Sequence, residues 1–233
     1  MKSLNNWLLV LLVLSCFGCS SPVHEDGRGC AFVSDSIQYR VEFMSAGCVR
    51  ILSFPQGDTL ITKRLVVDAE KPAFKDYKWE DTGQKLFFRT RELSVAFDKA
   101  DAAFTFQEVS TGKLLLKEKG DRKARNFKRS VAGGEQCLEV TQRFVPTDDE
   151  AIYGLGQYQN GIMNYRGKSV LLLQANMDIV NPFLISTNGY GVLWDNYSST
   201  KFEDTKEGYS FTSEVGDASD YYFVYGKDMD EVV

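Results

Sequence analysis

Residues 93–107 of the chain read Leu-Ser-Val-Ala-Phe-Asp-Lys-Ala-Asp-Ala-Ala-Phe-Thr-Phe-Gln, and this stretch decides the fold. Large apolar side chains alternate with smaller or polar ones over Leu93–Phe97 and again over Phe104–Phe106. A period of two puts every second side chain on the same face of a strand, so that one face can be buried. The stretch therefore predicts two half-buried strands joined by a polar turn.

Similar short apolar or alternating runs recur on both sides of this stretch, separated by joints rich in Gly and Asp. Their spacing of about ten residues is typical of an antiparallel β-sandwich. No segment before the C-terminus has the period of about 3.6 residues that marks an amphipathic helix. The sequence thus predicts an all-β domain, an antiparallel β-sandwich over residues 31–226. Besides Leu93–Phe97 and Ala103–Gln107, strands are expected at Ile37–Phe43, Cys48–Phe54, Lys85–Arg89, Lys113–Leu116, Cys137–Phe144, Val170–Gln174, Phe183–Ser186, Gly191–Trp194, Tyr209–Thr212 and Tyr221–Tyr225.

Composition narrows the chemistry that the chain can perform. The 233 residues are 43% hydrophobic and 25% charged, which is ordinary for a globular domain. The only histidine, His24, lies near the N-terminus, so the body of the chain offers no Ser-His-Asp triad and no histidine-containing zinc site. We expect no metal and no cofactor.

A basic run, Lys117–Arg129, contains seven basic residues and two acidic ones. A nucleic-acid patch is one interpretation and a solvated hairpin loop is the other. The net charge of the chain is −5, which favours the hairpin loop, and we expect no nucleic-acid partner.

The N-terminus has the layout of an export signal. A mildly basic leader, Met1–Asn6, precedes the apolar run Trp7–Leu14, which is far shorter than the ~20 residues of a membrane-spanning helix. The following Leu14–Ser21 resembles a bacterial lipobox, in which either Cys16 or Cys19 would carry the lipid; ordinary cleavage without a lipid is the alternative. We therefore expect a signal peptide over residues 1–18 (or 1–15) and a tether over 19–30. The mature protein would be an exported lipoprotein on the periplasmic or cell-surface face of the outer membrane, touching the membrane through its anchor only.

Three of the five cysteines, Cys30, Cys48 and Cys137, lie outside the leader. Because three is an odd number, at least one thiol stays outside any disulfide within the chain. We interpret all three as small, buried apolar residues.

A stretch near the middle of the second half is dense in glycine, amides and tyrosine. Gly154-Leu155-Gly156 allows positive φ or close backbone approach, and Gln157-Tyr158-Gln159-Asn160 follows directly. Amides bond sugar hydroxyls in both directions, and aromatic faces pack on sugar C–H groups. A sugar-binding loop and a polar turn held by its own amides are equally compatible with this pattern.

Several motifs in order give a family resemblance. They are Tyr153-Gly154-Leu155-Gly156-Gln157, Asn164-x-Arg166-Gly167, Gln174-x-Asn176, Asn181–Ser186, Gly189–Asn196 and Asp220–Gly226. Together they resemble the galactose-mutarotase-like N-terminal β-sandwich of glycoside hydrolase family 31. The version Gln157–Gly161 is similar to the α-xylosidase-like branch of that family.

The resemblance implies a retaining α-glycosidase whose two catalytic Asp residues lie on a separate (β/α)8 barrel. Retaining chemistry needs two carboxyl groups about 5–5.5 Å apart, and no nucleophile motif of the family is present here. The chain alone is therefore expected to be inactive and to contain no catalytic residue. The implied substrate is an oligosaccharide with an α-xyloside or α-glucoside. By resemblance, accessory substrate-binding residues are Gln157, Tyr158, Gln159, Asn160 and Asn164.

Two other readings remain open: a free-standing carbohydrate-binding surface lipoprotein, and an autonomous hydrolase. The second would use carboxylates such as Asp178, Asp195 or those of Asp148-Asp149-Glu150. The last group follows Pro146-Thr147, which predicts an exposed turn, and Asp195 suits a turn at a strand end.

The last residues predict the start of a helix. Asp228 can cap it, and Glu231 three residues later gives a spacing like that of a capping box. A helix of one turn is marginal by itself. We therefore expect residues 227–233 to begin a linker toward the missing catalytic barrel.

Overall fold

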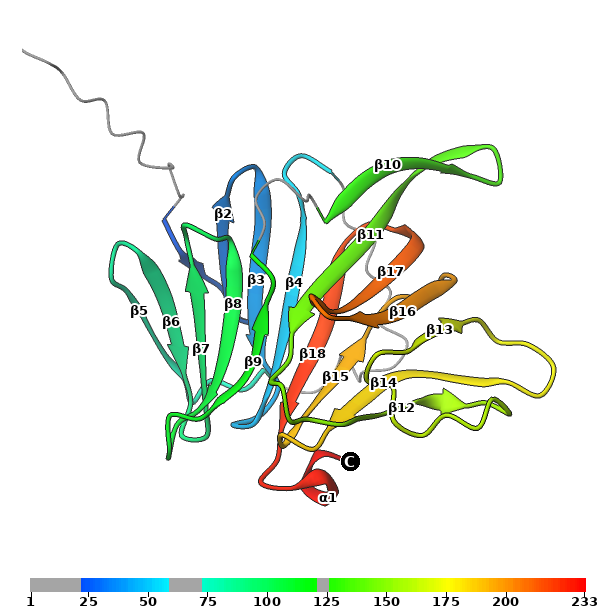
Figure 1. Ribbon diagram of the computed structural model, residues 1–233. Coiled ribbons are helices and arrows are strands. Elements are labelled where there is room, and N and C mark those ends of the chain that lie inside the picture. Colours follow the sequence, from blue (N-terminus) through cyan, green and yellow to red (C-terminus); the bar gives the residue numbers. More distant parts are fainter. Residues whose placement is uncertain (1–21, 59–72, 121–125) are drawn as a thin grey trace, which may run out of the picture.

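The computed structural model describes residues 22–58, 73–120 and 126–233, which form two antiparallel β-sheets packed face to face (Figure 1). The first sheet has the strand order β1-β2-β3-β4-β18-β15-β14-β12. The second has the order β13-β16-β17-β11-β9-β8-β7-β6-β5, and β10 pairs with β11. This architecture confirms the predicted all-β antiparallel sandwich.

Strands of the first sheet are β1 (His24–Glu25), β2 (Cys30–Ser34), β3 (Ile37–Phe43), β4 (Cys48–Pro55), β12 (Ile152–Gln157), β14 (Ile179–Ser186), β15 (Tyr190–Trp194) and β18 (Ser219–Tyr225). Strands of the second are β5 (Lys78–Asp81), β6 (Lys85–Arg89), β7 (Leu93–Asp98), β8 (Ala103–Glu108), β9 (Leu114–Glu118), β10 (Phe127–Ala132), β11 (Glu135–Val145), β13 (Ser169–Leu172), β16 (Thr200–Thr205) and β17 (Gly208–Gly216). One short helix, α1 (Met229–Val232), follows them.

The alternating stretch over residues 93–107 forms β7 and β8, as predicted. These strands pair with Phe97 opposite Phe104, and both rings are fully buried with their centroids 4.9 Å apart. Phe32 of the facing sheet lies 4.8 Å from Phe97. The aromatic core between the sheets is continuous because every second side chain of each strand points to the buried face.

Six strands lie outside the predicted runs: β1, β2, β5, β10, β12 and β16. In β16 the side chains of Thr200, Phe202 and Asp204 are buried while their neighbours are more exposed. The strand alternates, but two of its three buried residues are polar, so its sequence has no hydrophobic alternation that would predict it. The short β1 and the start of β2 fall within the segment expected as a tether.

The described ends of the basic run lie in strands rather than in the solvated hairpin loop that we expected. Lys117 and Glu118 belong to β9, and Phe127–Arg129 belong to β10, while residues 121–125 lie outside the described parts. Both strands pair with β11 rather than with each other. Glu118 faces the interior and is 5% exposed.

The C-terminal residues behave as the capping signal predicts. Asp228 caps α1 by accepting a hydrogen bond from the Glu231 amide at 3.0 Å. The Glu231 carboxylate accepts from the Lys227 amide, one residue earlier than in a capping box. The helix packs beside β14, β15 and β18 at the bottom of the view in Figure 1.

No disulfide joins Cys30, Cys48 and Cys137 within the described residues. Cys30 is buried, as expected of an apolar filler, but Cys48 and Cys137 are only half-buried. No helix in the described ranges is both long and apolar enough to cross a membrane. Cys16 and Cys19 lie outside these ranges.

Candidate functional site

The amide loop, which we define as Gln157–Asn164, leaves the end of β12 through a distorted turn. Gly154, Leu155 and Gly156 have φ values of +95°, +64° and +115°. A Cβ atom on Gly154 would lie 2.4 Å from the Phe183 carbonyl oxygen, and one on Gly156 would lie 2.1 Å from that of Ile179. Only glycine fits these two positions, and the resulting bulge in the β12–β14 pairing sets the direction of the loop.

The other end of the amide loop is fixed by Asn164 and Arg166. Asn164 Oδ1 accepts hydrogen bonds from the Ile152 and Arg166 amides, both at 3.1 Å. Arg166 Nε donates to Asp204 Oδ2 at 2.9 Å, and the Gly167 amide donates to the same oxygen at 2.6 Å. The motif Asn164-x-Arg166-Gly167 therefore clamps the loop to β12 and to β16 of the other sheet.

Beneath this clamp lies a buried glutamate that we expected in an exposed turn. Asp148 and Asp149 are exposed, but Glu150 is only 6% exposed. Its carboxylate accepts from Ser186 Oγ at 2.8 Å and from the Tyr190 hydroxyl at 3.0 Å, and Arg166 Nη1 lies 3.9 Å away. Burial raises the pKa of Glu150. The expectation was wrong for Glu150 because these donors, distant in sequence, satisfy the carboxylate inside the fold.

The structure brings all five predicted binding residues into the amide loop, but in different states. Tyr158 is half-buried, its hydroxyl donates to the Leu155 carbonyl at 3.0 Å, and burial raises its pKa to about 12. Asn160 Oδ1 accepts from the Ile162 amide at 2.9 Å, and Asn164 is part of the clamp. Gln157 and Gln159 are exposed and hydrogen-bond to no other described residue through their side chains. In these two residues the whole amide group remains available to a ligand.

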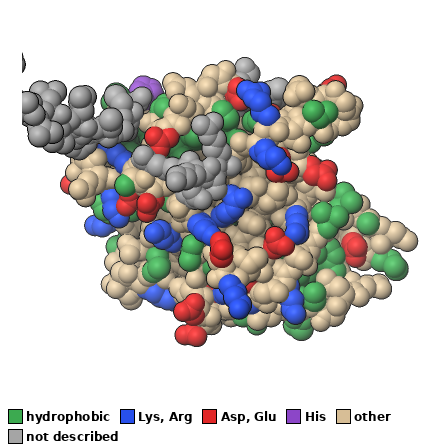
Figure 2. Space-filling view, turned by 45° about the horizontal axis from the view of Figure 1, so that its top comes forward, with side chains coloured by type: hydrophobic (Ala, Val, Ile, Leu, Met, Phe, Trp, Pro, Cys, Tyr) green, Lys and Arg blue, Asp and Glu red, His purple; other side chains and the backbone are tan. Residues whose placement is uncertain are grey.

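Exposed apolar side chains lie in the amide loop and in the neighbouring β13 and β14 segments. Met163 is 79% exposed and Met177 is 67% exposed, and other exposed apolar residues nearby are Leu171, Leu173 and Ile179. The hairpin that holds Met177 is closed by Gln174, which donates to the Asp178 carbonyl at 2.8 Å and accepts from the Val180 amide at 3.2 Å. Figure 2 shows hydrophobic side chains gathered on this projecting part of the molecule. Exposed apolar surface of this kind is typical of interaction sites.

The loop can bind but has no group that cleaves. Its polar side chains are amides and one tyrosine hydroxyl, which hydrogen-bond neutral hydroxyl groups. None of its residues is an Asp or a Glu, so it supplies neither member of a carboxylate pair. Among the described residues, no three His, Cys, Asp or Glu side chains are grouped closely enough to hold a metal ion.

Comparison with known families places this fold. Residues 38–203 match the family described as "Glycosyl hydrolase 31 N-terminal galactose mutarotase-like domain". The chain belongs to this family. The glycosyl hydrolase 31 match covers β3 to β16 and so includes the amide loop and its clamp.

Individual relatives agree with the family assignment. An α-xylosidase of Saccharolobus solfataricus is 31% identical over 213 residues, which are 85% of this chain and 27% of that protein. Among solved structures, an α-xylosidase from a soil metagenome complexed with xylose superposes with a TM-score of 0.74 at 21% identity, covering 89% of this chain and 32% of that one. A dextranase of Flavobacterium johnsoniae complexed with isomaltotriose gives a TM-score of 0.73 at 20% identity, covering 92% of this chain and 27% of that one.

These comparisons establish the domain and leave its substrate open. The chain spans only about a quarter to a third of each of these three relatives. The two structural neighbours share its fold while carrying the names of enzymes with different substrates. A shared fold therefore does not identify a substrate.

Proposed function

We propose that this chain is the N-terminal, non-catalytic module of a retaining α-glycosidase of the α-xylosidase or α-glucosidase type. In this proposal a (β/α)8 catalytic domain follows the module, and plant-type oligosaccharides are its substrates. The family assignment and the 31% identity to an α-xylosidase support the proposal. The amide loop would border the substrate pocket of the catalytic domain and contact the leaving-group sugar.

The single observation that carries this role is the state of Gln157 and Gln159. Both amides are exposed and without a side-chain partner among the described residues, on a loop whose two ends are fixed. A binding group is effective when its position is set in advance, because less conformational entropy is lost on binding. The clamp and the glycine bulge supply that preorganisation.

The exposed apolar surface around Met163 and Met177 supports a catalytic domain that packs against the part of the module that carries the amide loop. Helix α1 packs beside β14 and β15, and a Cβ on Gly191 would lie 2.8 Å from Val232. A catalytic domain that followed Val233 would thus begin next to the sheet that carries the amide loop. The apolar side chains would be covered when that domain docks.

Two carboxyl groups about 5–5.5 Å apart perform retaining hydrolysis, and the amide loop holds none. In the proposed enzyme both would come from the catalytic domain. The module would raise the affinity for the substrate without taking part in bond cleavage, which is the behaviour of uniform binding.

The proposed enzyme would be exported and held on a membrane through a lipid on Cys16 or Cys19. The short apolar run before these cysteines supports this location. Metabolic labelling with a fatty-acid analogue tests it, with Cys16→Ser, Cys19→Ser and the double variant. Label that survives in the double variant contradicts the proposal.

Steady-state kinetics test the role of the amide loop. The protein is expressed from its whole reading frame, including whatever is encoded after Val233, and assayed on xyloglucan fragments and on maltose, in which the leaving group is itself a sugar. The double variant Gln157→Ala/Gln159→Ala is expected to raise KM about five- to tenfold and to leave kcat within about twofold. Gln136→Ala, an exposed glutamine at the far end of β11, is the matched control and should change neither constant.

An unchanged KM in the double variant would contradict the binding role. Turnover by residues 1–233 alone would contradict the non-catalytic role. Binding of xyloglucan fragments by the chain alone, with no catalytic domain encoded, would favour a free-standing carbohydrate-binding protein instead.

A further inference from the structure

A cavity of about 780 Å³ opens between the two sheets at the end where the β2–β3 turn lies. This end of the sandwich lies opposite α1 in Figure 1. Its walls come from the β2–β3 turn, β4, β9, β10 and β11. Amide-loop residues do not line it. Its volume lies within the range of about 300–1,000 Å³ that is typical of small-molecule sites.

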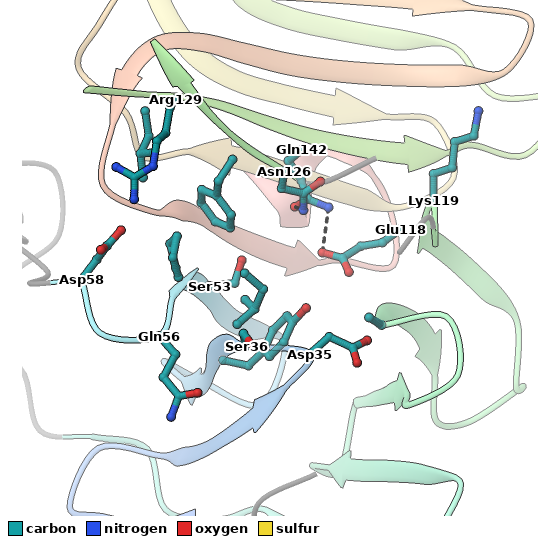
Figure 3. Close-up of a pocket in the computed structure, with 16 residues that line it drawn as sticks. Asp35, Ser36, Ser53, Gln56, Asp58, Glu118, Lys119, Asn126, Arg129 and Gln142 are labelled. Atoms are coloured by element: carbon teal, nitrogen blue, oxygen red, sulfur yellow. Dashed lines mark hydrogen bonds between the residues drawn. The ribbon is translucent and has the colours of Figure 1, made fainter. Parts of the chain in front are cut away.

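The cavity lining mixes hydrogen-bonding groups with apolar surface and favours neither sign of charge. Asp58 and Arg129 lie on one side of it, and Glu118 and Lys119 lie on the other (Figure 3). Amides and hydroxyls fill much of the remaining polar surface, and Ile37, Phe127 and Leu138 are apolar. A strongly charged ligand would meet like charge in such a site, whereas a neutral polyhydroxylated ligand matches both kinds of surface.

One wall of the cavity is held rigid by a chain of hydrogen bonds. Glu118 accepts from Gln142 Nε2 at 2.9 Å, from the Tyr221 hydroxyl at 2.7 Å and from the Phe104 amide at 2.7 Å. Gln142 Oε1 in turn accepts from Asn126 Nδ2 at 3.1 Å and from Ser219 Oγ at 2.9 Å. The bond between Gln142 and Glu118 is drawn in Figure 3. These contacts fix the orientation of Gln142 and of Asn126 at the cavity surface.

Ser53 presents a hydroxyl group to the cavity. This β4 residue is 5% exposed and lines the cavity, and its hydroxyl bonds to no described residue. Figure 3 shows its side chain directed into the cavity. This hydroxyl is therefore free to hydrogen-bond a hydroxyl group of a ligand.

Backbone conformation around the cavity is also unusual. Of the five non-glycine residues with positive φ in the described ranges, three line it: Asp35 at +50°, Ser36 at +63° and Ala102 at +53°. Asp35 and Ser36 form the two-residue turn between β2 and β3, where Asp-Gly is the usual pair. The side chain of Ser36 thus borders the cavity from a turn position that glycine would occupy without strain.

We propose that this inter-sheet cavity is a second binding site, distinct from the amide loop, and that its ligand is a neutral mono- or disaccharide. Ser53, Asn126 and Gln56 would hydrogen-bond the sugar hydroxyls, and Phe127 and Leu138 would contact its C–H faces. Because the site lies at the opposite end of the domain from α1, it would hold sugar away from the proposed catalytic pocket.

The test is titration of the chain with D-xylose, D-glucose and maltose by isothermal calorimetry. At least one of the three should bind with a Kd of about 1–10 mM. Ser53→Phe fills the cavity from β4 and should raise that Kd by at least about tenfold. Ser130→Phe, which lies on β10 but does not line the cavity, is the matched control and should bind as the wild type does.

Further variants keep the result decisive. Should Ser53→Phe fail to fold, the double variant Gln56→Ala/Arg129→Gln replaces two exposed cavity residues and should weaken binding about fivefold. Gln157→Ala/Gln159→Ala should leave this binding unchanged, because the amide loop is a separate site. The absence of saturable binding by all three sugars overturns the proposal, as does wild-type affinity in a folded Ser53→Phe or in the double cavity variant.

Discussion

Two buried glutamates lie under the two ends of this sandwich, and their surroundings differ. Glu150 sits below the amide loop with Arg166 Nη1 3.9 Å away and with two hydroxyl donors. Glu118 borders the inter-sheet cavity, and its recorded donors, Gln142, Tyr221 and the Phe104 amide, are all neutral. Burial raises the pKa of both.

The difference between the two glutamates indicates two structural roles: Glu150 holds the amide loop in place, and Glu118 orients a side chain at the cavity wall. Glu150 belongs to a cluster in which Arg166 joins three segments distant in sequence, so its main effect is on the position of the amide loop. Glu118 orients an amide, Gln142, at the wall of an open cavity. A buried carboxylate with a cation nearby thus stabilises a loop here, whereas one with neutral donors prepares a polar surface.

The largest effect is expected from Glu150→Ala. It removes the acceptor of Ser186 and Tyr190 and leaves these buried hydroxyls and part of Arg166 unsatisfied. We expect the free energy of unfolding to fall by about 3–5 kcal/mol, measured by urea denaturation. Glu150→Gln keeps the shape and one acceptor oxygen and should cost less than half as much. Equal losses in the two variants would contradict this expectation, because they would mean that the shape and the acceptor oxygen retained by Gln contribute nothing to stability.

Glu118 should make stability depend on pH in the opposite sense to an ion-paired carboxylate. Burial raises its pKa from 4.5 to about 7, so between these values the folded state binds a proton that the unfolded state releases. Protonated Glu118 therefore adds on the order of 3 kcal/mol to the free energy of unfolding. This stabilisation is fully present below about pH 4.5 and is lost as the pH rises to about 7.

Glu118→Gln imitates the protonated acid and should remove that pH dependence. Urea unfolding of wild type and variant at a series of pH values measures the difference between them. Glu207→Gln, whose parent side chain is exposed, is the control and should follow the wild type. A wild-type protein that gains stability over this range relative to Glu118→Gln would contradict the assignment.

A smaller and more local effect is expected from Asp204→Asn. Asp204 Oδ2 receives both Arg166 Nε and the Gly167 amide, and the substitution weakens this charge-assisted pair. We expect a loss of about 1–2 kcal/mol in stability and about tenfold faster hydrogen exchange in the amide loop, with exchange around Glu118 unchanged. Faster exchange at both ends of the sandwich would mean that the two clusters are not independent.

Features that depend on residues close together in the chain could be predicted from the sequence. The residue ranges of β3 and β6 match the predicted runs because their apolar alternation is local. The amide loop could also be located, since glycines and amides stand together in one stretch. Local pattern sufficed in both cases because the informative residues are neighbours in the chain.

The cluster beneath the amide loop and the inter-sheet cavity could not be predicted from local sequence patterns. Glu150, Arg166 and Asp204 come from three segments, and each side chain alone is typical of a solvated surface. Cavity residues such as Ser53, Asn126 and Gln142 meet only after the two sheets have paired and packed. Their roles depend on strand register and sheet packing, which no single stretch of sequence contains.

The smallest effect is expected at Ser36, in the β2–β3 turn at the cavity end of the sandwich. Ser36 has a φ of +63° in the two-residue β2–β3 turn, a conformation that glycine adopts without strain. Ser36→Gly should therefore raise the free energy of unfolding by about 0.5–1 kcal/mol, even though glycine makes the unfolded chain more flexible. Ser110→Gly, at an exposed turn residue without positive φ, should lower it instead. Because Ser36 lines the cavity, the same variant should lose some sugar affinity while it gains stability. A loss of stability in Ser36→Gly would mean that the β2–β3 turn is not strained at this position.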